Sequence, residues 1–377
     1  MAVHDFKKLE AVDTMRAEAG KNTIREILSE PRVWKECLNE LERKGVLEHL
    51  VRELRDDLEY VFVGCGSSFY LAQAAAAAWS LIAGGSARAV PASEVVLFPQ
   101  QLPVPCQPVL ISRSGFTSEV LQAANYLERR LNIRSLALTC GTNTALEKIA
   151  TYTVSLPAAD EKSTVMTRSF TSMLLALQSL AATRAQNGRF RTALHELSER
   201  TQTLLPEIHA TVRSLVEART FADYVFLGHG PLYGVAQEAM LKVMEMSCSY
   251  GQCFHTLEFR HGPKAIVGPE TLITFFLSDS GFEAEAGVLA EVKDLEGTTL
   301  VVADQVNPTV RRSADYLVEF SSNVPEAARA VALPIPGQLL GFYTGMKKGL
   351  DPDEPRNLTR VVTLESNKDG GLPGARA

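Results

Sequence analysis

The sequence lacks most of the features that mark membrane, secreted or nucleic-acid-binding proteins. Its six cysteines form no CxxC pair, so neither a disulfide framework nor a zinc knuckle is indicated. Lys and Arg form no extended basic block and the net charge is −6, which disfavours nucleic acid or an anionic membrane as a partner. The longest apolar stretch, residues 71–85, is too short to span a bilayer, and the charged N-terminus does not resemble a secretory signal. We therefore expect a cytoplasmic protein with neither a nucleic-acid nor a membrane partner.

Motifs for cofactors are also missing. The stretch YVFVGCGSSFYLAQ (residues 60–73) begins like a dinucleotide loop, but Phe69 stands where G-x-G-x-x-G needs its third glycine. No GK[ST] follows a glycine-rich turn, so there is no Walker loop. His255, Glu258 and His261 lack the helical HExxH arrangement, which makes a metal site the weaker interpretation of this segment. We predict no cofactor and no metal.

What the sequence does contain is the pattern of an α/β protein. A chain of 377 residues with 46% apolar residues is long enough for two globular units. Helical apolar spacing dominates the first fifty residues. From Tyr60 onward, short apolar runs alternate with helical segments, which is typical of parallel βαβ units, and we expect this strand pattern to continue through the apolar run ALPIPGQLLGFYTG (residues 332–345). We predict doubly wound, mostly parallel sheets flanked by helices in three layers.

Two stretches of the chain recur in the same order. YVFVGCGSSFYLAQ is repeated as YVFLGHGPLYGVAQ (residues 224–237), and PVLISRSGFTSE is repeated as ITFFLSDSGFEAE at nearly the same offset. We interpret the chain as two copies of one α/β unit. A hinge is expected near residues 204–221, where Pro206 should break a helical run. The predicted parts are a helical segment (1–50), a first domain (51–203), a second domain (204–366) and a disordered tail (367–377).

GCGSS and SRSGFTSE each lie where a strand passes into a helix. In a doubly wound sheet this is the ligand crevice, and helix N-termini there favour an anion. Hydroxyls in these turns can add donors to phosphate oxygens, although Ser and Thr also serve as ordinary helix caps. The second copy carries two acids where a phosphate would sit, Asp279 in place of Arg113 and Glu283 in place of Thr117, which favours an anion site in the first copy only. The candidate hydroxyls are those of Ser67, Ser68, Ser112, Ser114 and Thr117.

The second copy offers groups for proton transfer. Glu238, Lys242 and Glu245 form one polar strip on an otherwise apolar helix. Apolar surroundings raise the pKa of a carboxyl group toward the range useful in acid–base catalysis. From spacing alone, a Glu–Lys pair on the surface is the favoured interpretation, so that alternative stays open. His261, in a loop before Gly-Pro, is a further acid–base candidate.

The motifs GCGSS, SRSGFTSE, EAMLKVME, EFRHGP and DEPRNLTRVVTLE, in this order, resemble the tandem sugar isomerase (SIS) domain family. Within it, the chain is similar to the isomerase half of glutamine–fructose-6-phosphate amidotransferase, to amino-sugar-phosphate deaminases and to tagatose-6-phosphate ketose/aldose isomerases. The resemblance implies a metal- and nicotinamide-independent enzyme that moves a proton between C1 and C2 of a hexose 6-phosphate and releases ammonia. Isomerisation without loss of nitrogen, deglycation of a fructosamine phosphate and non-catalytic sensing are the alternatives.

The resemblance also implies a homodimer with shared active sites and a role for each matching residue. Glu245 would be the base, and His261 of the neighbouring subunit would open the sugar ring. Arg360 stands where the amidotransferase has a lysine, so it can bind an oxyanion but cannot form a Schiff base. No cysteine follows Met1, so we expect no ammonia from glutamine. The implied site consists of the catalytic Lys242, Glu245, His261 and Arg360, the phosphate ligands Ser67, Ser68, Ser112, Arg113, Ser114 and Thr117, and the pocket residues Gly66, Thr164, Thr167 and Glu238.

Overall fold

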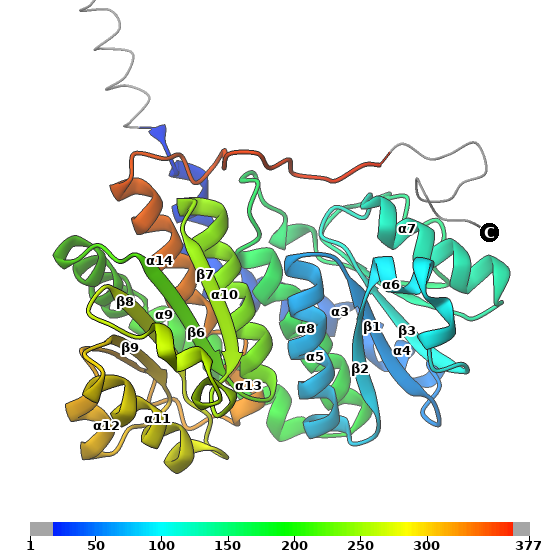
Figure 1. Cartoon of the computed structure of the whole chain (residues 1–377). Helices are drawn as coiled ribbons and strands as arrows, with labels where there is room; N and C mark the ends of the chain where they lie inside the picture. Colours follow the sequence, from blue (N-terminus) through cyan, green and yellow to red (C-terminus); the bar gives the residue numbers. More distant parts are fainter. Residues whose placement is uncertain (1–17, 365–377) are drawn as a thin grey trace, which may run out of the picture.

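The computed structural model describes residues 18–364, which fold into two α/β units placed side by side (Figure 1). Three helices precede the first sheet, as the helical spacing predicted: α2 (Lys21–Leu28), α3 (Glu30–Lys44) and α4 (Val46–Glu53). The predicted disordered tail, residues 367–377, lies outside the described residues. Between residues 18 and 364, no helix combines the length and the hydropathy needed to cross a bilayer.

The first unit is built on a parallel sheet of five strands in the order β2-β1-β3-β4-β5. All five coincide with apolar runs from which strands were predicted, and the central β3 and β4 are buried along their whole length. The strands are β1 (Glu59–Gly64), β2 (Ala87–Pro91), β3 (Cys106–Ile111), β4 (Leu136–Thr139) and β5 (Tyr152–Ser155). The helices that follow them are α5 (Ser67–Ala83), α6 (Ala92–Leu97), α7 (Ser118–Asn125), α8 (Arg168–Arg184) and α9 (Gly188–Ala218).

The second unit repeats this arrangement. Its five parallel strands follow the order β7-β6-β8-β9-β10, which is the order of the first sheet when the strands are counted along the chain. The strands are β6 (Asp223–Gly228), β7 (Tyr250–His255), β8 (Thr271–Phe276), β9 (Thr298–Ala303) and β10 (Tyr316–Glu319). The helices are α10 (Pro231–Ser247), α11 (Phe282–Asp294), α12 (Pro308–Ser313), α13 (Glu326–Arg329) and α14 (Pro334–Lys347). The predicted fold of parallel sheets flanked by helices is confirmed.

Three hydrophobic clusters hold the helices against the two faces of each sheet. The largest lies between the two sheets and includes Phe62 of β1 and Phe226 of β6. Val61 belongs to the cluster on the outer face of the first sheet, and Val225 to the cluster on the outer face of the second. Neighbouring residues of a strand point to opposite faces, so each central strand contributes to two clusters.

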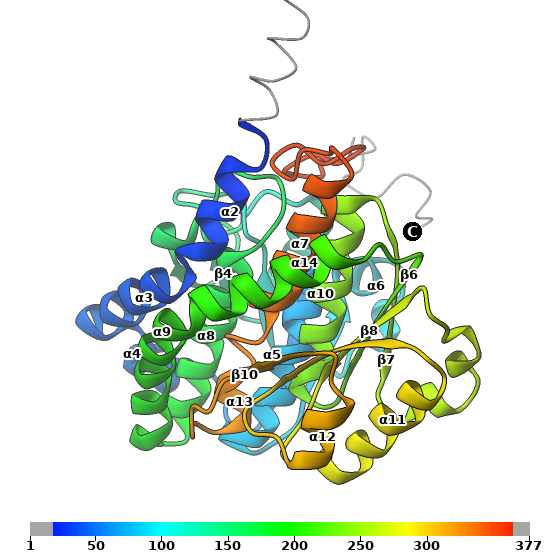
Figure 2. The same ribbon diagram turned by 90° about the vertical axis from the view of Figure 1, so that its left-hand side faces the viewer.

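Two expectations about the second half of the chain are wrong. Helix α9 runs through Pro206 without a break, because Leu204, Leu205 and Ile208 around the proline are buried and their packing outweighs the lost hydrogen bond (Figure 2). The boundary predicted between residues 203 and 204 therefore falls inside a helix. The apolar run before residue 346 was expected to continue the strand pattern, but it forms α14, which is buried over most of its surface.

Helix α14 packs against α10 through a row of glycines, Gly337, Gly341 and Gly345. A Cβ atom at position 341 would lie 2.5 Å from the backbone oxygen of Lys242. The missing side chain allows α14 to cover the backbone of the helix that carries the polar strip. The position of this strip in the fold thus depends on the close approach of α14.

We expect Gly341→Ala to lower the free energy of unfolding by about 1–3 kcal/mol, because the new methyl group meets backbone and forces the helices apart. Gly188→Ala is the matched control, since a Cβ at this first residue of α9 meets nothing within 4 Å. The control should be neutral or slightly stabilising. Urea unfolding of both variants tests this, and equal stabilities would show that the helices tolerate the methyl group.

Candidate active site

The first strand of each unit ends in the same turn. Gly66 has φ 54° and ψ −128°, and Gly230 has φ 52° and ψ −131°, a conformation that only glycine adopts readily. Helix α5 then begins with Ser67 and Ser68, whereas α10 begins with Pro231. The repeated sequence therefore forms a repeated backbone, and only the first copy places hydroxyls at the start of the helix.

The turn after β3 also has its counterpart after β8. Ser112 Oγ accepts a hydrogen bond from the backbone N–H of Gly115 at 3.1 Å, and Ser278 Oγ accepts one from Gly281 at 2.9 Å. Ser112 Oγ also lies 3.0 Å from Thr117 Oγ1. Ser112 is buried and fixes the shape of the turn.

A pocket of about 180 Å³ opens at the ends of β1 and β3. Its walls come from these two turns, from the loop between β5 and α8, from α10 and from the segment after α14. Nine of the predicted site residues line it: Gly66, Ser67, Ser68, Arg113, Ser114, Thr117, Thr164, Glu245 and Arg360. The other lining residues were not among the predicted ones: Cys65, Met166, Thr359, Val361 and Val362.

Five predicted residues do not line this pocket. Ser112 and Thr167 are buried behind its walls, and Glu238 and Lys242 lie fully buried next to Glu245. His261 is exposed after the short helix Glu258–Arg260, away from the pocket of its own chain. Within residues 18–364, no group of three His, Cys, Asp or Glu side chains could hold a metal ion.

The polar strip of α10 meets the start of α5 in the interior. Lys242 Nζ donates to Ser67 Oγ at 3.2 Å and lies 3.2 Å from Glu238 Oε1, and it is also paired with Glu245. Ser67 Oγ in turn donates to Glu238 Oε1 at 3.1 Å. Glu238 and Lys242 are 0% exposed, so the alternative of a surface pair is wrong.

Burial and charge set the protonation of this strip. Burial raises the pKa of Glu238 to about 8, although the ammonium of Lys242 opposes the shift. Burial alone would lower the pKa of Lys242, but the carboxylates of Glu238 and Glu245 outweigh it and raise that pKa. Glu238 Oε2 has no hydrogen-bond partner among the described residues, which fits a carboxyl group that spends part of its time neutral. Glu245 alone reaches the pocket, with 18% of its side chain exposed.

Glu238 should make stability fall as pH rises. Its folded pKa of about 8 lies above the ordinary value of 4.5, so the folded protein holds more protons between these limits and loses this advantage as pH passes through 8. We expect Glu238→Gln to gain stability relative to the unmodified protein between pH 5 and 8, by as much as a few kcal/mol. Urea unfolding at several pH values measures the difference. A difference that does not change with pH would mean that Glu238 ionises normally.

Carboxylates of the second unit bind the turn after β8, which corresponds to the turn after β3 in the first unit. Glu285 is fully buried and accepts hydrogen bonds from the backbone N–H of Ser278 at 2.7 Å and from Ser278 Oγ at 2.9 Å. His229 Nδ1 lies 2.8 Å from the same carboxylate. Asp279 pairs with the buried Arg329. Internal carboxylates thus occupy donors of the turn after β8.

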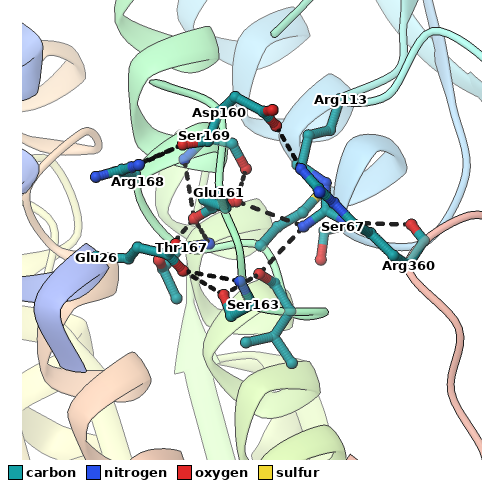
Figure 3. Close-up of polar contacts among 12 residues, drawn as sticks. Glu26, Ser67, Arg113, Asp160, Glu161, Ser163, Thr167, Arg168, Ser169 and Arg360 are labelled. Atoms are coloured by element: carbon teal, nitrogen blue, oxygen red, sulfur yellow. Dashed lines mark hydrogen bonds and ion pairs between the residues drawn. The ribbon is translucent and has the colours of Figure 1, made fainter. Parts of the chain in front are cut away.

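The loop between β5 and α8 contains a carboxylate that sequence analysis did not identify as functional (Figure 3). Glu161 is buried and lies 3.5 Å from Arg113 Nη1. It also accepts hydrogen bonds from the backbone N–H and the hydroxyl of Thr167, both at 2.7 Å. Thr167 therefore orients Glu161 and does not reach the pocket. The sequence signal is only an acid near a helix start, which is common in any protein.

Comparison with known proteins places the chain in a family. The model of the SIS domain matches residues 53–183, in the first unit. The crystal structure of glucosamine-6-phosphate deaminase from Thermotoga maritima is 30% identical, with a TM-score of 0.75, and the match covers 91% of this chain and 100% of that one. The chain belongs to the SIS domain family.

The chain matches two curated relatives over very different shares of their length. A candidate D-galactosamine-6-phosphate deaminase, AgaS, of Streptomyces coelicolor is 26% identical over 93% of this chain and 97% of its own length. The isomerizing glutamine–fructose-6-phosphate aminotransferase of Streptococcus pneumoniae is 32% identical over 68% of this chain and 43% of its own length. The chain spans about half the length of the aminotransferases that it matches.

Proposed function

We propose that this chain is a phosphosugar isomerase that deaminates an amino-hexose 6-phosphate to a ketose 6-phosphate. The observation that carries the proposal is the composition of one pocket. Ser67, Ser68, Ser114 and Thr117 lie at two helix starts on one side, and Glu245 faces the same space from α10. A phosphate donor set and a base within one pocket are what proton transfer on a sugar phosphate requires.

The phosphate monoester would bind at the starts of α5 and α7. Backbone N–H groups at a helix start carry partial positive charge, and the neighbouring hydroxyls add donors. Ser114 and Thr117 line the pocket beside the first turn of α7, and Ser68 lines it from α5. This arrangement holds the phosphate end of the substrate and leaves C1 and C2 to face Glu245.

The reaction would proceed by proton transfer at Glu245. In the open-chain sugar, Glu245 removes the proton from C2 while O1 gains a proton from water, which gives an enolamine. The protonated Glu245 then delivers a proton to C1 and leaves a ketimine at C2. Water adds to C2 and ammonia departs, so one water is consumed for each ammonia released. Lys242, paired with Glu245, orients that carboxylate.

We also propose that the second unit is a second SIS domain and that two copies of the chain share their active sites. The common strand order of the two sheets supports the first statement. The exposed position of His261, outside its own pocket, supports the second, because a second copy can then supply this ring as the group that opens the sugar.

Shared sites predict complementation between two inactive variants. Glu245→Gln and His261→Asn, refolded together in equal amounts, should regain about a quarter of the unmodified activity, because half of the dimers are hybrids with one intact site. Each variant refolded alone is the control. Continued inactivity of the mixture, with hybrid dimers demonstrated by mass spectrometry, would place both residues in the same subunit's site.

The proposed reaction is tested with a panel of hexosamine 6-phosphates and hexose 6-phosphates, with ammonia and ketose measured in parallel. We expect equal amounts of both products from at least one hexosamine 6-phosphate. Ketose without ammonia, from an aldose phosphate, would identify isomerisation without deamination. Binding of sugar phosphates without any product would identify a sensor and contradict the proposal.

A further inference from the structure

Arg113 connects two walls of the pocket that lie far apart in the sequence (Figure 3). Its Nη1 donates to the backbone oxygen of Val165 at 3.2 Å, and its Nη2 donates to the backbone oxygen of Arg360 at 3.0 Å. Val165 belongs to the loop before α8. Arg360 belongs to residues 355–364, here called the C-terminal segment, which crosses from α14 to the side of α7 (Figure 1). One guanidinium therefore holds both walls at once.

Glu161 fixes the position of this guanidinium. The carboxylate is fully buried, and the N–H and hydroxyl of Thr167 and Ser169 orient it at the start of α8. It balances the charge of Arg113, whose side chain is 6% exposed. Removal of either partner leaves the other as an uncompensated buried charge.

A second set of contacts holds the C-terminal segment from outside. Arg360 Nη2 donates to Asp160 Oδ1 at 2.7 Å. The backbone oxygen of Val362 accepts from the N–H of Ser118 at 3.3 Å, and the N–H of Leu364 donates to Ser118 Oγ at 2.9 Å. The segment is thus attached to the first turn of α7, next to Thr117 of the pocket.

Arg113 still has unused donors. A guanidinium carries five N–H groups, and the contacts described above leave Nε–H and part of Nη2 without an acceptor among residues 18–364. Arg113 lines the pocket on the turn between Ser112 and Ser114. An anion in the pocket can therefore bind Arg113 while the contacts to both walls persist.

We propose that Arg113 and Glu161 are positioning residues that couple phosphate binding to closure of the C-terminal segment over the pocket. The proposal rests on the proposed function for the identity of the ligand. Glu161 holds the guanidinium, the guanidinium holds Val165 and Arg360, and the bound phosphate adds a further partner at the same centre. Closure then protects the backbone of the segment when the phosphate is bound.

The second unit offers a matched control. Arg329 is also a buried arginine, with 4% of its side chain exposed, and it pairs with Asp279 and donates to the backbone oxygen of Val324. Asp279 lies on the turn after β8, which corresponds to the turn after β3 that carries Arg113. Arg329→Gln removes a comparable buried guanidinium at a distance from the pocket, so it separates general destabilisation from loss of the closure.

Hydrogen exchange of the full chain, followed by mass spectrometry with and without inorganic phosphate, tests the proposal. In the unmodified protein, phosphate should slow exchange in residues 355–364. In Arg113→Gln this exchange should be about tenfold faster and no longer respond to phosphate, because the charge-assisted hydrogen bond to the backbone oxygen of Arg360 is lost. Arg113→Lys should keep phosphate binding but lose the protection, since an ammonium cannot form the planar two-sided contact. Arg329→Gln should leave the segment unchanged.

Steady-state kinetics provides a second measurement, in which KM and kcat should respond differently to the substitution. For the phosphosugar that the unmodified protein converts, Arg113→Gln should raise KM about tenfold and change kcat much less. Unchanged exchange and unchanged KM in Arg113→Gln would overturn the proposal, and so would equal acceleration of exchange in Arg329→Gln. If the unmodified protein converts no phosphosugar, the proposed function fails. Hydrogen exchange measured with and without inorganic phosphate still tests whether phosphate binding is coupled to closure of the C-terminal segment.

Discussion

Glu245→Gln is expected to lower kcat for phosphosugar turnover by about 10³-fold, because an amide can neither accept nor return the proton. The substitution keeps the size of the side chain and leaves an oxygen to accept from Lys242, so the fold should persist. Phosphate affinity should also persist, since the proposed donors lie at the starts of α5 and α7. Steady-state kinetics together with isothermal titration of inorganic phosphate separates the two effects.

The matched control for this prediction is Glu283→Gln, in the exposed first turn of α11. This variant loses the same charge and should retain the activity of the unmodified protein. Turnover by Glu245→Gln at an undiminished rate would mean that another group carries the proton. Loss of phosphate binding together with turnover would point to a structural role for Glu245.

Lys242→Met should produce the largest loss of stability. The ammonium is fully buried between Glu238 and Glu245, and the variant leaves both carboxylates without their cation. Removal of one partner from a buried ion pair typically costs about 3–5 kcal/mol. Protonation of Glu238 offsets part of this cost, so the loss should be smaller at pH 5 than at pH 8.

The double variant Lys242→Met with Glu238→Gln distinguishes charge from packing. It removes the buried carboxylate that the single variant leaves unpaired, so it should recover a large part of the lost stability. Lys35→Met, at an exposed pair with Glu199, should change stability by less than about 0.5 kcal/mol. If the double variant is as unstable as Lys242→Met alone, the packing of the lysine stem, and not its charge, stabilises α10.

The fold was largely predictable because its strands are local signals. The runs that form β1 and β6 are apolar and β-branched, and each ends in glycine, so both the strand and the turn follow from nearby residues. Strand β7 was not predicted, because YGQCFH has a weak strand pattern and forms as the edge neighbour of β6. Helix α14 was misassigned, because burial on nearly all sides removes the helical period from its sequence.

The site was predictable only in part. Its hydroxyls and Glu245 lie in short motifs that the repeat sets apart, and the pocket brings them together. The role of Glu161 depends on its contact with Arg113. The two residues are 48 positions apart in the chain, and only the fold brings them together. Ser112 and Thr167 carry the right chemical groups, but their hydroxyls are used inside the walls. Spacing could not distinguish hydroxyls that face the pocket from those that support it.

The most direct test of the account is turnover of a hexosamine 6-phosphate in D₂O, followed by NMR of the ketose product. Proton transfer through Glu245, with exchange of its carboxyl proton for solvent deuterium before delivery, predicts deuterium at C1 of the ketose, with ammonia and ketose formed about 10³-fold more slowly by Glu245→Gln. A product that carries deuterium and forms at the same rate in Glu245→Gln would contradict the account, as would the absence of any conversion by the unmodified protein.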